Sequence, residues 1–80
     1  MLLDANPYVK SLIIFNSGAI TIKYNGVVET FHISYLKSVW ESKRGNYYMV
    51  YYPKAIDTSV RFILNKKQYK TVVDYMIYNE

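Results

Sequence analysis

The stretch "FNSGAITIKYNGVV", residues 15–28, contains two turn signals that set the fold. Asn16-Ser17-Gly18 predicts a three-residue hairpin loop, because glycine readily takes the left-handed conformation that such a loop requires. Asn25-Gly26 is the strongest two-residue hairpin signal in the chain. Alternating apolar residues flank both turns, so the sequence predicts three antiparallel strands over about residues 8–15, 19–24 and 27–34.

The two turns also predict one strand register. The first loop places Phe15 opposite Ala19, and the second places Tyr24 opposite Val27. A shift of one residue would move every apolar side chain to the wrong face, so the register is strongly specified. In this register one face of the sheet carries most of the large apolar residues, namely Leu12, Ile14, Ile20, Ile22, Tyr24, Val27, Phe31 and Ile33.

Four residues fit this register poorly. Glu29 falls on the apolar face, where we expect it near the rim. Ile13, Phe15 and Val28 fall on the polar face. They predict an exposed apolar patch there.

The second half of the chain predicts another hairpin, one more strand and a helix. The turn at residues 43–46 separates strands over 36–42 and 47–52, and Pro53 ends the second strand because proline has no N–H to donate. A loop leads to a strand over residues 60–64. Asn65 and Gln68 form a capping-box pattern at the start of the final helix. The helical apolar stripe is expected to pack against the sheet: Tyr69, Val72, Val73, Met76 and Ile77.

This order of elements predicts one α+β domain over residues 1–80. We expect a curled antiparallel sheet or partial barrel of five to six strands, packed by one C-terminal amphipathic helix. Residues 30–77 resemble the second half of a pleckstrin-homology or GRAM-like domain. The resemblance rests on Ile33-Ser34-Tyr35-Leu36, placed like that family's bend before a hairpin, and on Arg61-Phe62 in the last strand. It implies the architecture, and a lipid or membrane adaptor as a function.

The composition argues against catalysis. The chain of 80 residues has no cysteine and one histidine, His32, which we expect on a strand surface. The three glycines lie in predicted turns, so no glycine-rich phosphate loop is present in the sequence. The six acidic residues show neither metal-ligand spacing nor paired positions suited to acid–base chemistry. We expect a protein that is not an enzyme and has no cofactor and no metal.

Location and origin are also predicted from composition. The N-terminus has no basic segment followed by an apolar one, and no apolar run approaches membrane length, so we expect a soluble cytoplasmic protein. Lysine, isoleucine, asparagine and tyrosine are frequent, which is typical of A/T-rich genomes. The small size and this bias suggest a phage- or virus-type accessory protein.

Charge singles out two groups of candidate binding residues. The net charge is +4, and most of it comes from the second half of the chain. Lys43 and Arg44 lie in the turn before the tyrosine-rich strand. Lys66, Lys67 and Lys70 lie in the first turns of the helix, where cations oppose the helix dipole, so we interpret them as candidate anion contacts.

Aromatic residues supply the other candidates. Residues 47–52 contain four tyrosines, and strand alternation directs either Tyr47 and Tyr51 or Tyr48 and Tyr52 to the core. The sequence leaves this choice open, and we take Tyr48 and Tyr52 as the candidate exposed pair. Trp40 is expected in the core, because a domain of this size has few large residues with which to build one.

Three functions are compatible with this sequence. The leading hypothesis is inhibition or modulation of a host partner protein through an aromatic and basic surface. A nucleic-acid-binding module is the first alternative, with phosphate contacts from lysine and arginine and base stacking on tyrosine. A pleckstrin-homology-like lipid or membrane adaptor is the second alternative. Self-association is compatible with the exposed apolar residues, and an integral membrane protein is not expected.

Overall fold

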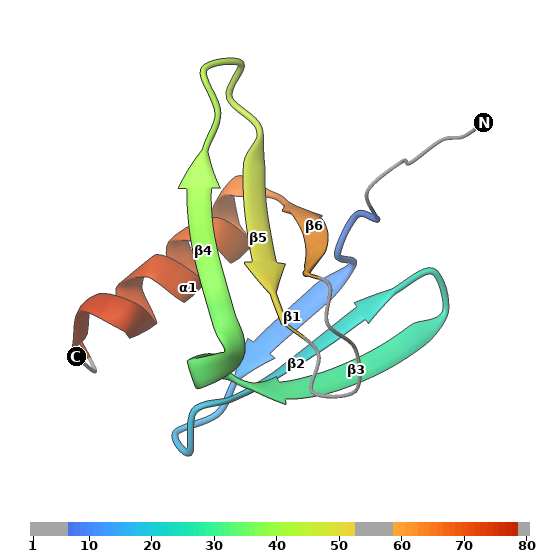
Figure 1. Ribbon diagram of the computed structural model, residues 1–80, viewed down its shortest axis with the longest axis vertical. Coiled ribbons are helices and arrows are strands. Elements are labelled where there is room, and N and C mark those ends of the chain that lie inside the picture. Colours follow the sequence, from blue (N-terminus) through green and yellow to red (C-terminus); the bar gives the residue numbers. More distant parts are fainter. Residues whose placement is uncertain (1–6, 53–58, 79–80) are drawn as a thin grey trace.

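The computed structural model describes residues 7–52 and 59–78, which form six strands, one short 3₁₀ helix and one α-helix. The strands fall into two antiparallel sheets of three, ordered β1-β2-β3 and β4-β5-β6 (Figure 1). We call them the N-terminal and the C-terminal sheet. The element bounds are β1 Ser11–Ile14, β2 Ala19–Tyr24, β3 Val27–His32, η1 Ile33–Tyr35, β4 Leu36–Glu41, β5 Tyr47–Tyr51, β6 Val60–Leu64 and α1 Lys66–Tyr78.

The predicted register of the N-terminal sheet is confirmed. Ile20 pairs with Ile14 on one side and with Phe31 on the other, and Tyr24 pairs with Val27. The turn residues take the left-handed conformation that the sequence predicts, with φ of 92° at Gly18 and of 47° and 76° at Asn25 and Gly26. The two turns therefore fix the register through their backbone geometry.

Glu29 lies on the apolar face, as the register predicts, and has a partner there. The Tyr24 hydroxyl donates a hydrogen bond to the Glu29 carboxylate. This hydrogen bond is the main cause that raises the pKa of Tyr24 to about 12, with smaller contributions from burial and from the charge of Glu29. The side chains of Ile13, Phe15 and Val28 are exposed on the opposite face, as expected.

The ends of β1 and β3 differ from the predicted ones. The third strand ends at His32 instead of residue 34, because η1 turns the chain there. The Ser34 N–H donates to His32 Nδ1 at 3.1 Å, and the Ile33 N–H donates to the Gly18 carbonyl at 2.8 Å. The first strand begins at Ser11 instead of residue 8, because Tyr8 forms a bridge to Ile63 of the other sheet.

The expectation of a curled sheet or partial barrel is wrong. The two sheets are separate, and neither is curled or closed. At η1 the chain changes direction, so β4 pairs with β5 instead of extending the sheet of β3. The segment Pro7–Val9, which leads into β1, joins the other sheet at β6 through the Tyr8–Ile63 bridge. Two hydrogen bonds accompany this bridge, from Val9 N–H to Ile63 O and from Ile63 N–H to Pro7 O.

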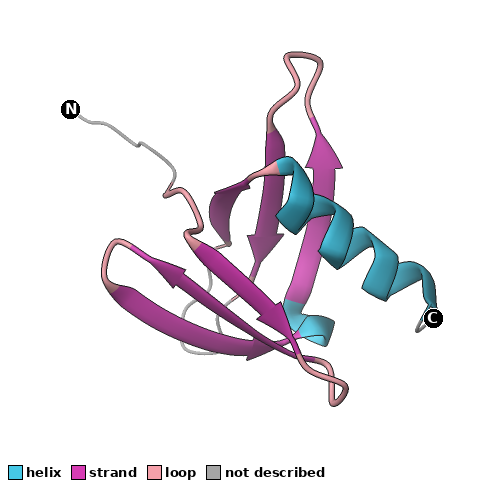
Figure 2. Cartoon of the chain, turned by 180° about the vertical axis from the view of Figure 1, so that it is seen from behind, coloured by secondary structure: helices cyan, strands magenta, loops and turns pink. Residues whose placement is uncertain are grey.

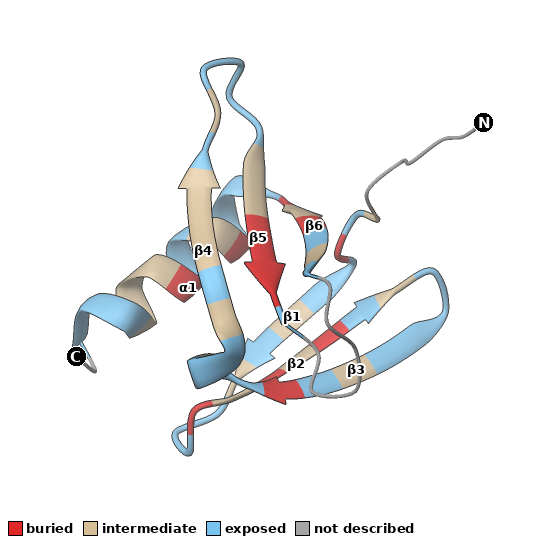
Figure 3. Ribbon diagram, in the orientation of Figure 1, coloured by how far each residue is buried: buried red, intermediate tan, exposed pale blue. Residues whose placement is uncertain are grey.

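The core lies between the two sheets and α1. Its buried residues come from both sheets, from Pro7–Val9 and from the helix, as Figure 3 shows for β2, β5, β6 and α1. The Tyr51 ring stacks on the Phe31 ring, with the centroids 4.0 Å apart, and lies 5.8 Å from that of Phe62. The fully buried side chains are Ile20, Ile22, Met49, Phe62 and Val72. Both apolar faces thus share one core.

The predicted capping box is present at the start of α1. The Gln68 N–H donates to Asn65 Oδ1 at 2.7 Å, and the Asn65 N–H donates to Gln68 Oε1 at 2.9 Å. Gln68 is buried, and its side-chain amide donates to the Val9 carbonyl at 2.9 Å. The cap therefore also attaches the N-terminal segment to the helix. No helix in the described part of the chain is long and apolar enough to cross a membrane.

The helix packs on the sheet over only part of its length, which corrects the expectation for its apolar stripe. Val72 is fully buried, whereas Met76 and Ile77 are 42% and 58% exposed. The helix crosses the C-terminal sheet, and its C-terminal end extends beyond β4, the edge strand (Figures 1 and 2). Met76 and Ile77 are therefore only partly covered by the described residues.

Candidate interaction surface

The C-terminal sheet has one face toward the helix and one face toward solvent. Strand alternation and the register bring one set of side chains to the solvent side, because cross-strand partners share a face. We call this set the outer face; its residues are Ser38, Trp40, Tyr48, Val50, Tyr52, Arg61 and Ile63, of which Val50 is buried.

The structure answers the question that the tyrosine-rich strand raised. Met49 and Tyr51 are buried in the core, and the Tyr47 ring packs against Tyr69 of the helix at 4.7 Å. Tyr48 and Tyr52 therefore belong to the outer face, as the candidate pair requires. Tyr52 is 41% exposed and Tyr48 is half-buried.

Three side chains of different strands form a cluster on the outer face. Trp40 and Tyr48 are cross-strand partners with ring centroids 5.2 Å apart and an interplanar angle of 31°. The Arg61 guanidinium carbon lies 5.4 Å from the centre of the Trp40 ring and 5.7 Å from that of Tyr48. Such cation–π contacts contribute about 0.5–1 kcal/mol each at exposed sites. Arg61 itself is exposed, so the cluster combines a fixed cation with two partly covered rings.

Trp40 and Arg61 are two residues of this surface that the sequence did not predict. The expectation that Trp40 lies in the core is wrong, because its partner Tyr48 points away from the helix. The turn at residues 43–46 carried part of the signal, since it pairs position 40 with position 48 and so puts both on one face, but it does not say which face the helix covers. Arg61 gave no signal of its own, because it pairs with Val50 of β5 and no short turn sets the register between β5 and β6.

A second aromatic and basic pair lies further along the same face. The Lys37 ammonium donates a hydrogen bond to the Tyr52 hydroxyl at 3.2 Å and lies 5.1 Å from the centre of the Tyr52 ring. A bulge between Leu36 and Ser38 interrupts the pairing of β4 at this point. Lys37 was not among the predicted site residues, although it belongs to the same basic half of the sequence.

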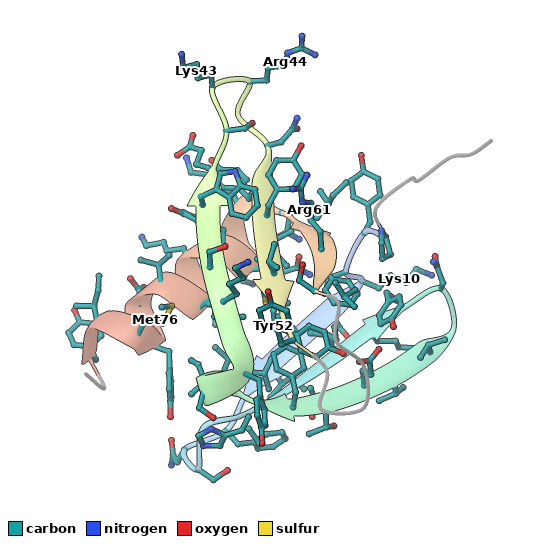
Figure 4. The ribbon with its side chains drawn as sticks, in the orientation of Figure 1. Lys10, Lys43, Arg44, Tyr52, Arg61 and Met76 are labelled. Atoms are coloured by element: carbon teal, nitrogen blue, oxygen red, sulfur yellow. The ribbon has the colours of Figure 1, made fainter. Side chains whose placement is uncertain are left out.

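Lys43 and Arg44 lie at the tip of the β4–β5 hairpin, beyond the helix and the core (Figure 4). Both are exposed. They are on the same hairpin as Trp40 and Tyr48, so the basic turn and the aromatic cluster belong to one continuous projection of the molecule.

The lysines of the helix start do not join this surface. Lys66 and Lys70 line a pocket between α1 and the C-terminal sheet, on the side opposite to the outer face, with Glu41, Tyr47, Tyr69 and Val73. Lys67 is exposed and does not line that pocket. The predicted binding residues are therefore divided: Lys43, Arg44, Tyr48 and Tyr52 lie on the outer face or its hairpin, and Lys66, Lys67 and Lys70 lie on the helix.

The outer face and its hairpin tip are cationic without compensation from described residues. Lys37, Lys43, Arg44 and Arg61 are exposed there. The described carboxylates lie elsewhere: Glu29 on β3, Glu41 on the helix side of β4, and Asp74 on α1. No group of three or more His, Cys, Asp or Glu residues able to hold a metal ion occurs in ranges 7–52 and 59–78.

The comparisons with known proteins add no family to this description. The chain matches no protein-family model, no curated protein and no solved structure. The likeness to pleckstrin-homology domains stays a prediction from sequence pattern. The chemistry of the outer face is therefore the basis on which a function is argued.

Proposed function

We propose that the protein is a non-catalytic binding module that takes hold of a partner protein through the outer face of its C-terminal sheet. The observation that carries this proposal is the cluster of Trp40, Tyr48 and Arg61 on the outer face, in which Arg61 is exposed and both rings are half-buried. Tryptophan, tyrosine and arginine are the three residue types most enriched at positions that dominate binding energy in protein interfaces.

The cluster is suited to an acidic partner surface. The contacts with two rings restrict the Arg61 side chain before binding, so less conformational entropy is lost when it pairs with a ligand. Its guanidinium N–H groups bind a carboxylate with two parallel hydrogen bonds, a geometry that lysine does not offer. Lys37, Lys43 and Arg44 add positive charge around it, which accelerates the encounter with an acidic surface. Occupation of a partner's working surface would inhibit or modulate that partner.

A nucleic-acid ligand is the alternative that the same surface raises. Aromatic side chains among cations are also the composition of single-strand binding surfaces. Bases, however, stack on open ring faces, and Arg61 lies over both the Trp40 and the Tyr48 ring. This geometry favours a protein partner over a stacked strand.

The test is affinity capture from cells of the source organism with two charge-reversed baits. Arg61→Glu removes the cation of the cluster, and Lys10→Glu makes the same change of charge at an exposed position on the N-terminal side (Figure 4). We expect a partner protein that wild type and Lys10→Glu capture and that Arg61→Glu loses. Equal capture by all three proteins would refute the role of the outer face. Melting temperatures of the three proteins establish that each is folded.

A nuclease arm separates the two ligand classes. Capture that disappears after nuclease treatment indicates nucleic acid instead of a protein. Nucleic-acid binding also falls steeply, by orders of magnitude, between about 50 and about 200 mM salt when many phosphates are contacted. Retention of the partner after nuclease treatment and at the higher salt supports the protein-binding proposal.

A further inference from the structure

The described structure has a second open surface, on the opposite side of the C-terminal sheet from the outer face. A groove with a volume of about 440 Å³ runs between α1 and β4. Its walls are apolar and come mainly from the helix: Val39, Tyr69, Val73, Met76 and Ile77. Tyr69 and Val73 also line the neighbouring pocket of Lys66 and Lys70, so the groove continues to the basic start of the helix.

One wall of the groove is the edge of a sheet. In the described part of the chain, β4 has one strand neighbour, β5, on one side. The Ser42 N–H donates a hydrogen bond to the Asn46 carbonyl, so Ser42 and Asn46 form a hydrogen-bonded pair. Along an antiparallel ladder, hydrogen-bonded pairs alternate with pairs that are not hydrogen-bonded to each other. The pairs Glu41–Tyr47 and Val39–Met49 are therefore not hydrogen-bonded to each other through their backbones. Consequently Val39 and Glu41 direct their backbone N–H and C=O groups away from β5, toward the open edge.

We propose that this groove binds an extended segment of an acidic partner protein, which adds to the C-terminal sheet as a strand beside β4. Its backbone pairs with Val39 and Glu41, and its alternate side chains enter the apolar groove against Val73 and Met76. Exposed edge strands are templates for such additions. The proposal concerns a surface that the proposed function does not use.

The charges that line one end of the groove favour an acidic segment as its ligand. At the end of the groove near Glu41, the lining carries Lys66 and Lys70, so this end has two cations and one anion. The helix N-terminus lies at the same end and adds a partial positive charge. An acidic residue at that end of the segment is therefore favoured. A second copy of this chain, with a net charge of +4, is repelled by the same field.

The first step of the test defines the ligand chemistry with a random dodecapeptide display library as the probe. Wild-type protein is expected to select peptides with apolar residues at every second position and Asp or Glu toward one end. The Lys66→Glu/Lys70→Glu variant is expected to select Lys or Arg at that position. The proposal would be overturned if the selected peptides carried apolar residues at helical spacing or if no peptide were enriched. It would also be overturned if the variant kept the charge preference of the wild-type protein.

Block and control variants locate the binding. Met76→Glu and Ile77→Glu place a charge in the groove at partly exposed positions, so the fold has little reason to fail. Both are expected to lose the selected peptide, whereas Tyr78→Glu, at a residue 83% exposed and outside the groove lining, keeps it. Arg61→Glu is also expected to keep it, which distinguishes this surface from the outer face. Peptide binding by Met76→Glu and Ile77→Glu at the wild-type level would overturn the proposal.

Backbone methylation of the selected peptide tests strand addition directly. Methyl groups on the alternate nitrogens that face β4 remove donors without changing a side chain, and the affinity is expected to fall on the order of tenfold. Methylation of the other set of nitrogens is the matched control and leaves the affinity unchanged. Equal loss in both peptides, or in neither, would exclude a strand. Sedimentation that shows a dimer sensitive to Met76→Glu would instead assign the groove to a second copy and overturn the proposal.

Discussion

The side-chain amide of Gln68 donates a hydrogen bond to the Val9 carbonyl across 2.9 Å, although the two residues are 59 positions apart. The same side chain accepts from the Asn65 N–H through its oxygen. One buried amide therefore closes the helix cap and attaches the N-terminal segment, which in turn joins the two sheets through Ile63. Stability at this junction depends on an element that the sequence shows only as a local cap.

Gln68→Ala is expected to lower the free energy of unfolding by about 1–3 kcal/mol, because buried backbone groups lose their partners. The matched control is Lys67→Ala, at the adjacent exposed position, with an expected change within about 0.5 kcal/mol. Urea denaturation followed by circular dichroism measures both. Equal stability of the two variants would show that the Val9 contact contributes nothing.

Two adjacent tyrosines are expected to respond very differently to truncation. Tyr51 is 2% exposed and stacks on Phe31, so Tyr51→Ala leaves a cavity and costs about 3–5 kcal/mol. Tyr52 lies on the outer face, and Tyr52→Ala costs less than about 1 kcal/mol. Thermal melts followed by circular dichroism compare the two. The reverse order of melting temperatures would place the wrong face of β5 in the core.

Alkaline pH is expected to destabilise the protein through Tyr24. Its pKa is about 12 in the folded state against the ordinary value of 10.0, so the unfolded chain loses this proton first as the pH rises. The stability that Tyr24 contributes is therefore fully present below about pH 10 and is lost as the pH rises toward about 12.

The comparison with Tyr24→Phe isolates this effect from the titration of the lysines, which both proteins share. The difference in unfolding free energy between the two proteins should be constant from neutral pH to about pH 9 and should shrink above about pH 10. Denaturant titrations at a series of pH values measure it. A difference that grows above pH 10 would contradict the hydrogen bond to Glu29.

Gly18 is expected to be the least replaceable glycine. It has a φ of 92°, and an added Cβ would lie 2.7 Å from His32 Nε2. Gly45 has a similar φ of 83°, but its added Cβ meets nothing within 4 Å. Gly45→Ala therefore costs only the backbone strain of about 1–2 kcal/mol, whereas Gly18→Ala adds displacement of the His32 ring.

The His32 ring is hydrogen-bonded to both Ser17 and Ser34. Its NMR signals therefore give a second measurement for the comparison of Gly18→Ala with Gly45→Ala. Since Nδ1 accepts from the Ser34 N–H, Nε2 carries the proton and donates to the Ser17 carbonyl at 3.2 Å. In Gly18→Ala this hydrogen bond is expected to break, with a change in the ¹⁵N shifts of the imidazole. Unchanged imidazole shifts together with equal stability of the two alanine variants would contradict the close approach.

The sequence by itself determined the elements that depend on neighbours a few residues apart. The turns at Asn16–Gly18 and Asn25–Gly26 fixed the register of the N-terminal sheet, because turn type and loop length leave one pairing. The capping box of Asn65 and Gln68 fixed the start of the helix, because its two reciprocal hydrogen bonds join residues three positions apart. These interactions are complete within the local chain, so a pattern can predict them.

Only the tertiary structure decided which faces are covered. Alternation in residues 47–52 allowed either set of tyrosines in the core, and the side on which α1 packs selected Met49 and Tyr51. The same choice places Trp40 on the outer face, where Arg61 from β6 lies over its ring. The overhang of Met76 and Ile77 depends likewise on where β4 ends the sheet. Burial is shared between segments distant in sequence, so no local pattern contains it.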